Sequence, residues 1–388
     1  MSQTIYLDNA ATTPVSQPVL DAMLPYFCTC YGNPSSHYSI GYETKDAIDT
    51  ARAQVAKVLN CLSAEVFFTG CGTESDNWAI KGTAYKLAKK GKKHLITSAI
   101  EHHAVLNSMA ALEKEGFTVT YLPVDEKGFV NPDDVEAAIR PDTALVSIMY
   151  ANNEIGTIEP VAKIGEICRK HGVWFHTDAV QAAGAVAIDV QAQNIDMLSL
   201  SAHKFNGPKG TGVLYIRRGV LPYNFMDGGG QENHRRAGTE NIAGIVGLGA
   251  ALAHANETLR EKAEHQAALR DYVITRVLKN IPQTHLNGDA VRRLPGNANI
   301  SFAGLEGETI LMDLDMHGVC ASTGSACNSD SLDPSHVLLA IGLPHEAAHG
   351  TMRFSFGPQN TMEEAEQLCA ILEQIIPARR AMSPIWNA

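Results

Sequence analysis

TALVSIMY (143–150), VAKIGEICRKHG (161–172) and VWFHTDAV (173–180) follow one another as a strand, a helix and a strand. The outer two segments are short, apolar and rich in β-branched residues, and the middle one is helix-like and ends at a glycine. A unit of this kind predicts parallel strands joined by a covering helix.

The same alternation extends over residues 65–217. EVFFTG precedes the helix-like ESDNWAIKGTAYKLAKKG, and HLITSAI precedes AVLNSMAALEKEG. We therefore expect an α/β fold with a mainly parallel sheet covered by helices on both faces. Such sheets bind ligands beyond the carboxyl ends of their strands, where TGCGTES, EHHA, ANNEIG, DAVQ and SAHKFNGPKG follow. This series of polar loops predicts a single ligand-binding site at that edge of the sheet.

A second, smaller α/β unit follows the sheet region. Residues 239–279 read as one long helix that links the two units, and the segments after it alternate strand and helix again. A chain of 388 residues is long enough for about two domains.

Composition excludes several classes of protein. The formal net charge of -11 argues against a broad basic surface for nucleic acid. No stretch has the length of a membrane span, and the N-terminus lacks a targeting pattern, so we expect a cytoplasmic protein with no membrane contact. The eight cysteines show no CxxC and no zinc-like spacing with histidine, which favours reduced thiols and no intrinsic metal.

Lys204 in SAHKFNGPKG is the strongest candidate for a reactive group. An apolar strand delivers it into a turn-rich loop, where a desolvated lysine is nucleophilic. A solvated loop lysine is the ordinary alternative. Ser201 and His203 favour the reactive role because both are able to donate hydrogen bonds to a phosphate.

Further residues suit the same ligand. Gly72 and Thr73 of TGCGTES open a helix, and backbone N–H groups at a helix start bind anions. Asp178 ends the strand VWFHTD, and a buried carboxylate needs a cation or a strong donor, such as a protonated ring nitrogen within reach of Gln181. A helix N-cap is the alternative for Asp178.

A Schiff-base lysine, a phosphate cradle and an aspartate for a ring nitrogen are together typical of pyridoxal 5'-phosphate. The chain resembles the cysteine desulfurases of the class V aminotransferase-like fold, most of all the NifS group linked to nitrogen fixation. The resemblance runs from YLDNAATTP to RFSFG and includes IEHHA, NNEIG, SAHKFNGPKG, RRAGTENI and STGSACNS. It implies a transferase fold with a large domain at 13–258, built on a seven-stranded type of sheet, and a small domain formed by 1–12 and 259–388.

The resemblance also implies roles for single residues. Lys204 would carry the cofactor, Lys204 or His102 would move the substrate α proton, and Arg353 of TMRFSFG would bind the substrate carboxylate. Pattern alone would make Arg353 a solvated strand-end residue. The other implied cofactor contacts are Asp178 at the ring nitrogen, Gln181 and Asn153 at the phenolic oxygen and the substrate, His102 on the ring face, and Gly72, Thr73, Ser201, His203 and a second subunit's Thr239 at the phosphate.

The implied reaction converts L-cysteine to L-alanine and leaves a persulfide on Cys327, in ASTGSACNSDS (321–331). Small polar residues suit a thiol that travels between the cofactor and an outside acceptor. We expect a homodimer that passes sulfur to an iron–sulfur scaffold or another acceptor protein, for nitrogenase maturation in particular. Cys327 could also act as a transient iron–sulfur ligand, and Cys71, where the family more often has glycine or serine, adds a thiol near the cofactor.

Four alternatives stay open at this stage. One is a housekeeping iron–sulfur desulfurase, although this chain ends in RRAMSPIWNA and lacks the longer tail of that group. Another is a selenocysteine lyase, which would use the same machinery and differ in its discrimination against sulfur. An aminotransferase of the same fold would need no thiol. A sulfur carrier or scaffold without a cofactor would be colourless.

Overall fold

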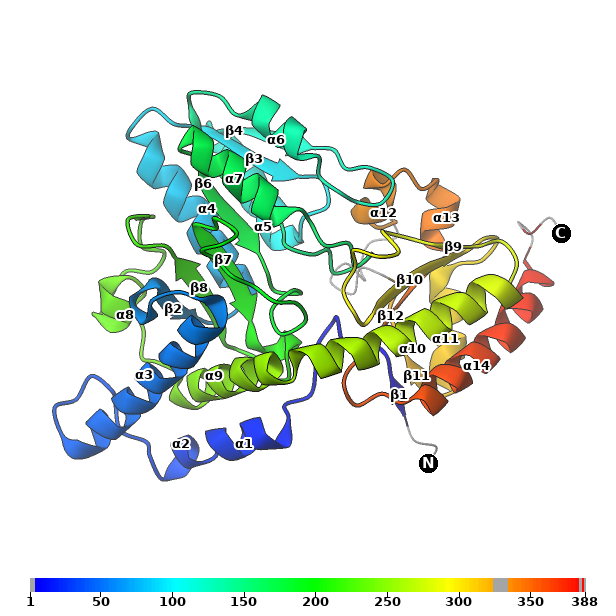
Figure 1. Ribbon diagram of the computed structural model, residues 1–388, viewed down its shortest axis with the longest axis horizontal. Coiled ribbons are helices and arrows are strands. Elements are labelled where there is room, and N and C mark those ends of the chain that lie inside the picture. Colours follow the sequence, from blue (N-terminus) through cyan, green and yellow to red (C-terminus); the bar gives the residue numbers. More distant parts are fainter. Residues whose placement is uncertain (1–3, 324–333, 384–385, 387–388) are drawn as a thin grey trace.

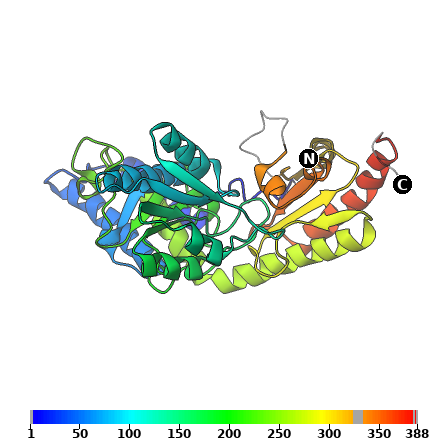
Figure 2. The ribbon, with the colours of Figure 1, turned by 90° about the horizontal axis from the view of Figure 1, so that it is seen from above.

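The computed structural model describes residues 4–323, 334–383 and 386. The chain forms a larger and a smaller α/β unit, and helices α9 (Ile242–Glu257) and α10 (Leu259–Asn280) run along the same side of both (Figure 1; Figure 2). Within the described ranges, no helix has the length and apolar character that a membrane crossing requires.

Among the described residues, seven strands form the sheet of the larger unit, in the order β2-β8-β7-β6-β5-β3-β4. β8 is antiparallel to both of its neighbours, and the other strands all run parallel, as predicted. Only ten residues join β7 to β8, too few for the crossover that a parallel pair needs. The strands are β2 (Val66–Thr69), β3 (His94–Ser98), β4 (Thr118–Leu122), β5 (Thr143–Ser147), β6 (Trp174–Asp178), β7 (Met197–Ser201) and β8 (Gly212–Ile216).

Helices cover both faces of this sheet (Figure 1). Successive strand residues point to opposite faces, so Leu145 packs among the residues of α4 and α5 whereas Val146 packs with α3, α7 and α9. The helices of the larger unit besides α9 are α1 (Gln17–Met23), α2 (Pro25–Cys28), α3 (Ser39–Leu59), α4 (Gly72–Ala88), α5 (His103–Lys114), α6 (Pro132–Ala138), α7 (Val161–His171) and α8 (Gln231–His234). The predicted stop at Gly172 is confirmed by its left-handed φ of 64° at the end of α7.

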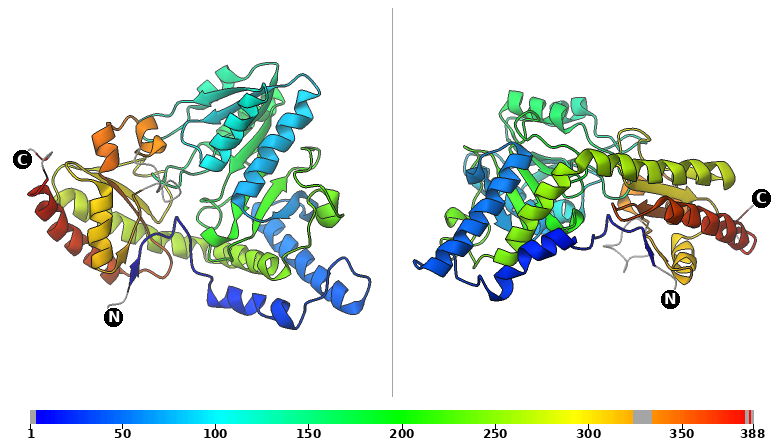
Figure 3. Two further views of the ribbon diagram at one scale, coloured as in Figure 1. Left: turned by 180° about the vertical axis from the view of Figure 1, so that it is seen from behind. Right: turned by 60° about the horizontal axis from the view of Figure 1, so that its bottom comes forward.

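The smaller unit contains an antiparallel sheet and a short parallel pair. β12 (Thr351–Ser355), β10 (Asn297–Phe302) and β9 (Thr284–Leu286) form the sheet, and β1 (Ile5–Tyr6) pairs with β11 (Val319–Cys320). α10, α11 (Gly307–Met316) and α14 (Met362–Arg380) pack on it, so that the N-terminal strand lies among residues from the last third of the chain (Figure 3). The domain boundaries at 12/13 and 258/259 stay a prediction.

The single long helix expected over 239–279 is wrong, because the structure has two helices there. α9 ends and α10 begins at Thr258, whose φ of -98° and ψ of 8° are not helical. The Thr258 hydroxyl donates to the carbonyl oxygen of His254 at 2.9 Å, the local side-chain bond by which threonine competes with helical geometry.

Helices α12 (His336–Ala340) and α13 (His345–His349) connect the units at one edge. Val337 and Leu338 of α12 share a buried apolar cluster with Ile100, Met149 and Ile155 of the larger unit. Full burial of such a side chain stabilises by about 1.5–3 kcal/mol. The chain that follows residue 333 is therefore docked on the larger unit.

Candidate active site

A cavity of about 420 Å³ opens at the carboxyl ends of the parallel strands and is lined by side chains of both units. Small-molecule sites commonly have this size. Its lining includes ten of the residues predicted from sequence: Gly72, Thr73, His102, Asn153, Asp178, Gln181, Ser201, His203, Lys204 and Arg353. The structure thus brings these side chains together, while their chemical roles stay predictions.

Lys204 reaches the cavity from a short 3₁₀ helix, Ala202–Lys204, directly after β7. Its Nζ donates to the carbonyl oxygens of Ala10 at 2.6 Å and Ala11 at 2.8 Å. Gln181 donates through Nε2 to the same Ala10 oxygen at 2.9 Å. The N-terminal stretch YLDNAATTP therefore forms part of the wall and orients the amine through two neutral acceptors.

Asp178 lies at the end of β6 and is 6% exposed. Its Oδ1 accepts a hydrogen bond from the N–H of Val180 at 2.9 Å, within a turn. No helix begins in residues 179–196, all of which the structure describes, so the alternative of a helix N-cap is wrong. Burial raises the pKa of Asp178, and nearby His102 and Lys204 oppose that shift by favouring the carboxylate.

His102 caps the N-terminus of α5. Its Nδ1 accepts from the N–H of Ala104 at 3.1 Å, which places the proton of the neutral ring on Nε2. Burial lowers the pKa of His102, so the neutral ring is the form that lines the cavity. A neutral imidazole at the wall suits contact with a flat aromatic ligand.

The start of α4 forms one end of the cavity. Gly72 and Thr73 are its first two residues, so their N–H groups have no partner within the helix. A Cβ on Gly72 would lie 2.7 Å from Cγ2 of Val180, so a larger residue would crowd this end. The two N–H groups that the helix leaves without a partner and the absent side chain of Gly72 fit an anion such as phosphate.

Ser201 lies beside Gly72, where an added Cβ would be 3.5 Å from the Cβ of Ser201, and His203 lines the same cavity. His203 Nδ1 lies 3.1 Å from Oγ1 of Thr12, and burial lowers the pKa of His203 to about 4. The ring is therefore neutral near pH 7 and can still donate one hydrogen bond. Cys71 also lines the cavity, as expected for a second thiol near the cofactor.

Sequence analysis missed two buried carboxyl groups beside Asp178. Glu101, on the loop after β3, accepts through Oε1 from the Ser98 hydroxyl at 2.6 Å and the Met149 N–H at 2.9 Å. Asp76 lies one helical turn after Thr73, on the inner face of α4, and is 1% exposed. The sequence offered two signals for them. Asp76 stands three residues after Thr73, a predicted contact, and Glu101 stands directly before His102.

These carboxyl groups test whether the residues present fit pyridoxal phosphate. Oδ1 of Asp76 and Oε2 of Glu101 are buried without a hydrogen-bond partner, and both residues line the cavity. Burial lowers the pKa of neighbouring His176 to about 3, so this ring is neutral and supplies no positive charge. A protonated ring nitrogen at Asp178 would supply it, so the donor set fits the cofactor. The described residues contain no group of three side chains suited to a metal ion.

The folding stability of the cofactor-loaded Glu101→Gln protein is expected to depend less on pH than that of the parent. Burial raises the pKa of Glu101 from 4.5 to about 8, so the folded state keeps a proton that the unfolded chain releases in this window. The stabilisation is full below pH 4.5 and is lost as pH rises through 8, by an amount on the order of a few kcal/mol.

Thermal unfolding at pH 5 and pH 8.5 checks this expectation. Glutamine imitates the protonated acid. The melting temperature of the variant should therefore exceed that of the parent at pH 8.5 and differ little from it at pH 5. An equal difference at both pH values would contradict a proton on Glu101.

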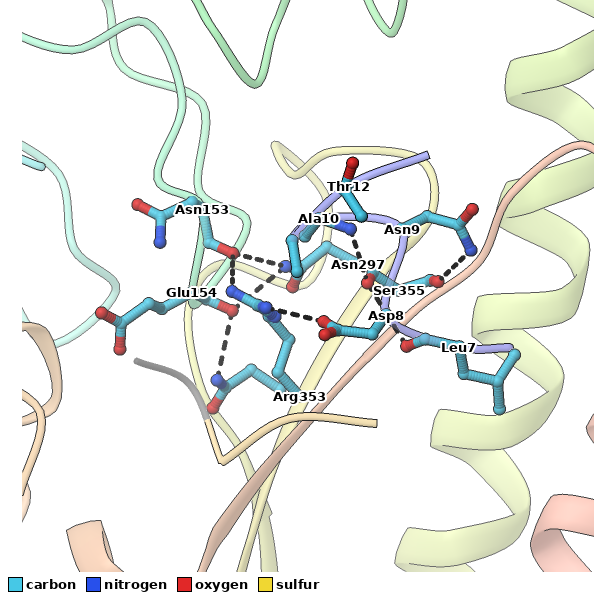
Figure 4. A network of polar contacts seen from close by, with 12 residues as sticks. Leu7, Asp8, Asn9, Ala10, Thr12, Asn153, Glu154, Asn297, Arg353 and Ser355 are labelled. Atoms are coloured by element: carbon cyan, nitrogen blue, oxygen red, sulfur yellow. Dashed lines mark hydrogen bonds and ion pairs between the residues drawn. The ribbon is translucent and has the colours of Figure 1, made fainter. Parts of the chain in front are cut away.

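Arg353 of β12 carries a guanidinium group into the cavity from the smaller unit (Figure 4). The side chain is 2% exposed, which makes a solvated strand-end arginine the wrong alternative. Nη2 donates to Oδ1 of Asp8 at 2.8 Å and Nη1 donates to the carbonyl oxygen of Asn153 at 3.1 Å. Asp8, two residues before Ala10 in YLDNAATTP, was not predicted.

Of the predicted residues that the structure describes, Thr239 is not in the cavity wall of its own chain, and it is exposed. Cys327 lies outside the described residues. The wall instead adds His103, Glu154 and His336, of which His103 and Glu154 stand inside motifs quoted from the sequence, EHHA and NNEIG.

Comparisons with known proteins agree on one family. The aminotransferase class-V family matches residues 5–368. A protein of Clostridium botulinum named cysteine desulfurase IscS is 56% identical over 389 residues, covering 100% of this chain and 98% of the relative. A solved NifS-like protein superposes with a TM-score of 0.91 at 39% identity, covering 97% of this chain and 100% of the other. SspA, solved in complex with cysteine, gives a TM-score of 0.81 at 39% identity, covering 92% and 100%.

Proposed function

Because the chain belongs to the aminotransferase class-V family and its 56% identical relative is a cysteine desulfurase, we infer that it is a pyridoxal-phosphate-dependent cysteine desulfurase. The observation that carries this function is the cavity, which holds a lysine, a buried aspartate and a buried arginine against a helix start. A buried arginine and four acidic residues line this one cavity, and burying such groups is costly unless charged or hydrogen-bonding partners satisfy them.

The proposed roles of the lysine and the histidine follow from their hydrogen bonds. The bound cofactor supplies an electron sink for the substrate α carbon. We assign the α-proton transfer to Lys204, because the Nδ1 lone pair of His102 is engaged by the Ala104 N–H and its Nε2 already carries a proton. His102 then serves as a neutral contact and a donor.

Substrate orientation is assigned to Arg353. An arginine binds a carboxylate strongly through paired N–H groups, and this one is buried where water competes little. Asp8 and the Asn153 carbonyl hold the guanidinium in place. SspA, solved with cysteine, supports a substrate of that size in this fold.

Sulfur capture is assigned to Cys327, and the flanking chain supports it. Ser322 pairs with Arg353 through two backbone hydrogen bonds of 3.2 and 2.6 Å, so the segment leaves the smaller unit beside the cavity. Cys327 follows five residues later in the sequence, and five residues span at most about 17 Å. The thiolate attacks the substrate sulfur, the C–S bond breaks, and its electron pair goes to the substrate carbon, which takes up a proton and becomes the methyl group of alanine.

We propose that the persulfide on Cys327 supplies iron–sulfur cluster assembly through an acceptor protein. The relative named IscS supports general cluster supply, and nitrogenase maturation stays a prediction from the resemblance alone. All seven cysteines within the described ranges are free thiols, which suits the proposed cytoplasmic location.

A homodimer is proposed from an exposed apolar surface. Between residues 24 and 42 the chain exposes large side chains that a monomer ordinarily buries: Leu24, Phe27, Tyr31, Tyr38 and Tyr42, each more than half exposed. They lie on and around α1 to α3, at one border of the larger unit (Figure 3). Thr239, exposed and outside its own cavity, would then serve the partner's phosphate site.

The proposed reaction has a defined product balance. Incubation of the purified protein with L-cysteine should give L-alanine and protein-bound persulfide sulfur in equal amounts during the first turnover. An aminotransferase would instead give a keto acid and need an amino acceptor. Alanine without any persulfide would argue against a desulfurase, and a strong preference for L-selenocysteine in direct competition would favour the lyase.

A further inference from the structure

Glu154 is a buried acid in the cavity wall with no role in the proposed chemistry. It follows β5 in the motif NNEIG and is 3% exposed. Its N–H donates to Oδ1 of Asn152 at 2.8 Å, and its carbonyl oxygen accepts from the side-chain amides of Asn297 and Asn299, each at 3.1 Å (Figure 4). The backbone of Glu154 is therefore fixed by both units.

The carboxylate of Glu154 holds the residue that begins α12. The Ser335 hydroxyl donates to Oε2 of Glu154 at 2.5 Å. The Ser335 hydroxyl oxygen also caps α12, because it accepts from the N–H groups of Val337 at 3.1 Å and Leu338 at 3.5 Å. A hydroxyl has one proton, and the Ser335 hydroxyl donates it to Glu154. Because the same hydroxyl caps α12, this bond fixes the direction in which the chain enters the helix.

A second contact fixes the neighbouring residue. His336 donates through Nε2 to the carbonyl oxygen of Glu101 at 3.0 Å, and its ring lies 4.9 Å from the ring of His103. Both contacts join α12 to the wall that carries His102. Ser335 stands eight residues after Cys327 in the sequence. The contacts of Ser335 and His336 therefore fix the chain to the cavity wall eight residues from the thiol.

We propose that Glu154 is a positioning residue for sulfur transfer, which acts through Ser335 on the chain that carries Cys327. The proposal rests on the role assigned to Cys327. Transfer needs the thiol and the substrate sulfur in near-contact geometry, and fixing a tether close to the site raises the population of that geometry. Cofactor binding and substrate binding use other groups and are not expected to depend on Glu154.

Single-turnover kinetics with the cofactor-loaded protein and L-cysteine test this role. In Glu154→Ala, persulfide formation on Cys327 should slow by about tenfold or more, with the cofactor absorbance unchanged and half-saturation by L-cysteine within about twofold of the parent. Glu154→Gln should restore most of the rate, because an amide oxygen still accepts from Ser335.

Two further variants separate positioning from a general loss of stability. Glu159 is equally buried, follows in the same loop and does not line the cavity, so Glu159→Ala should lower the melting temperature without slowing persulfide formation in the folded protein. In a Ser335→Ala background, Glu154→Ala should have little further effect, because both changes remove the same contact.

The outcomes also distinguish this proposal from the function on which it rests. Parent-like persulfide formation in Glu154→Ala, or a loss explained by weaker cofactor or cysteine binding, overturns the positioning role. Persulfide formation that continues in Cys327→Ser overturns the assignment of the thiol instead.

Discussion

Replacing Lys204 by alanine is expected to lower L-cysteine turnover by on the order of 10³-fold or more, because the change removes both the covalent attachment of the cofactor and the proposed α-proton carrier. The amine enters the cavity beside Asp178 and is oriented by the carbonyl oxygens of Ala10 and Ala11. No other lysine lines this cavity within the described residues, so none replaces it there.

Borohydride reduction provides a direct readout for Lys204. In the parent protein, the yellow colour should bleach and the cofactor should remain on the peptide that contains Lys204 after denaturation. In Lys204→Ala the cofactor should separate from the denatured protein. Lys209 lies in the same loop and is exposed, so Lys209→Ala serves as the matched control and should keep both colour and turnover. A reduced cofactor on a lysine other than Lys204 would falsify the assignment.

The parts of the site that sequence predicted all depend on local order. A strand that ends in Asp178 or Ser201 must present the next few residues at the same edge of the sheet, because β5, β6 and β7 run parallel and their crossover connections return the chain in one direction. Segments far apart in the chain could therefore be assigned to one cavity before any contact was known. Lys204 and His102 are found there for this reason.

The parts that sequence missed depend on packing between distant segments. Asp8, Ala10 and Ala11 reach the site because β1 pairs with β11 in the smaller unit, and no local pattern encodes that pairing. For Arg353, only the family resemblance predicted a place in the site; the local pattern favoured a solvated residue, since its partner Asp8 stands 345 positions away. Long-range pairs of this kind are set by the tertiary fold.

The buried acids were missed for a different physical reason. A carboxyl group ordinarily predicts a charged, solvated side chain, and Asp76 and Glu101 depart from that rule because burial raises their pKa values, that of Glu101 to about 8. The break at Thr258 was missed for another reason: one side-chain hydrogen bond competes there with the helix that the pattern predicted.

Cys327→Ser is expected to abolish persulfide formation and to lower L-cysteine turnover by on the order of 10³-fold or more, while the absorbance change on adding L-cysteine remains. Serine keeps the size of the side chain but offers an oxygen of far weaker nucleophilicity towards sulfur. Binding, by contrast, uses Arg353 and Lys204, which this variant leaves intact. The prediction thus separates capture of the sulfur from recognition of the amino acid.

Cys71 is the thiol that could imitate this role, because it lines the cavity at the start of α4 and is exposed. It is fixed there, however, between β2 and a helix of 17 residues, so it cannot carry sulfur from the cavity to an outside protein. Cys71→Ser should therefore keep turnover within about threefold of the parent, because the change removes no group assigned to the reaction. Sulfur on Cys71 in the Cys327→Ser protein, with turnover preserved, would transfer the proposed role to Cys71. Mass analysis of the two cysteine peptides after one turnover decides between the thiols, since only the true acceptor gains one sulfur atom.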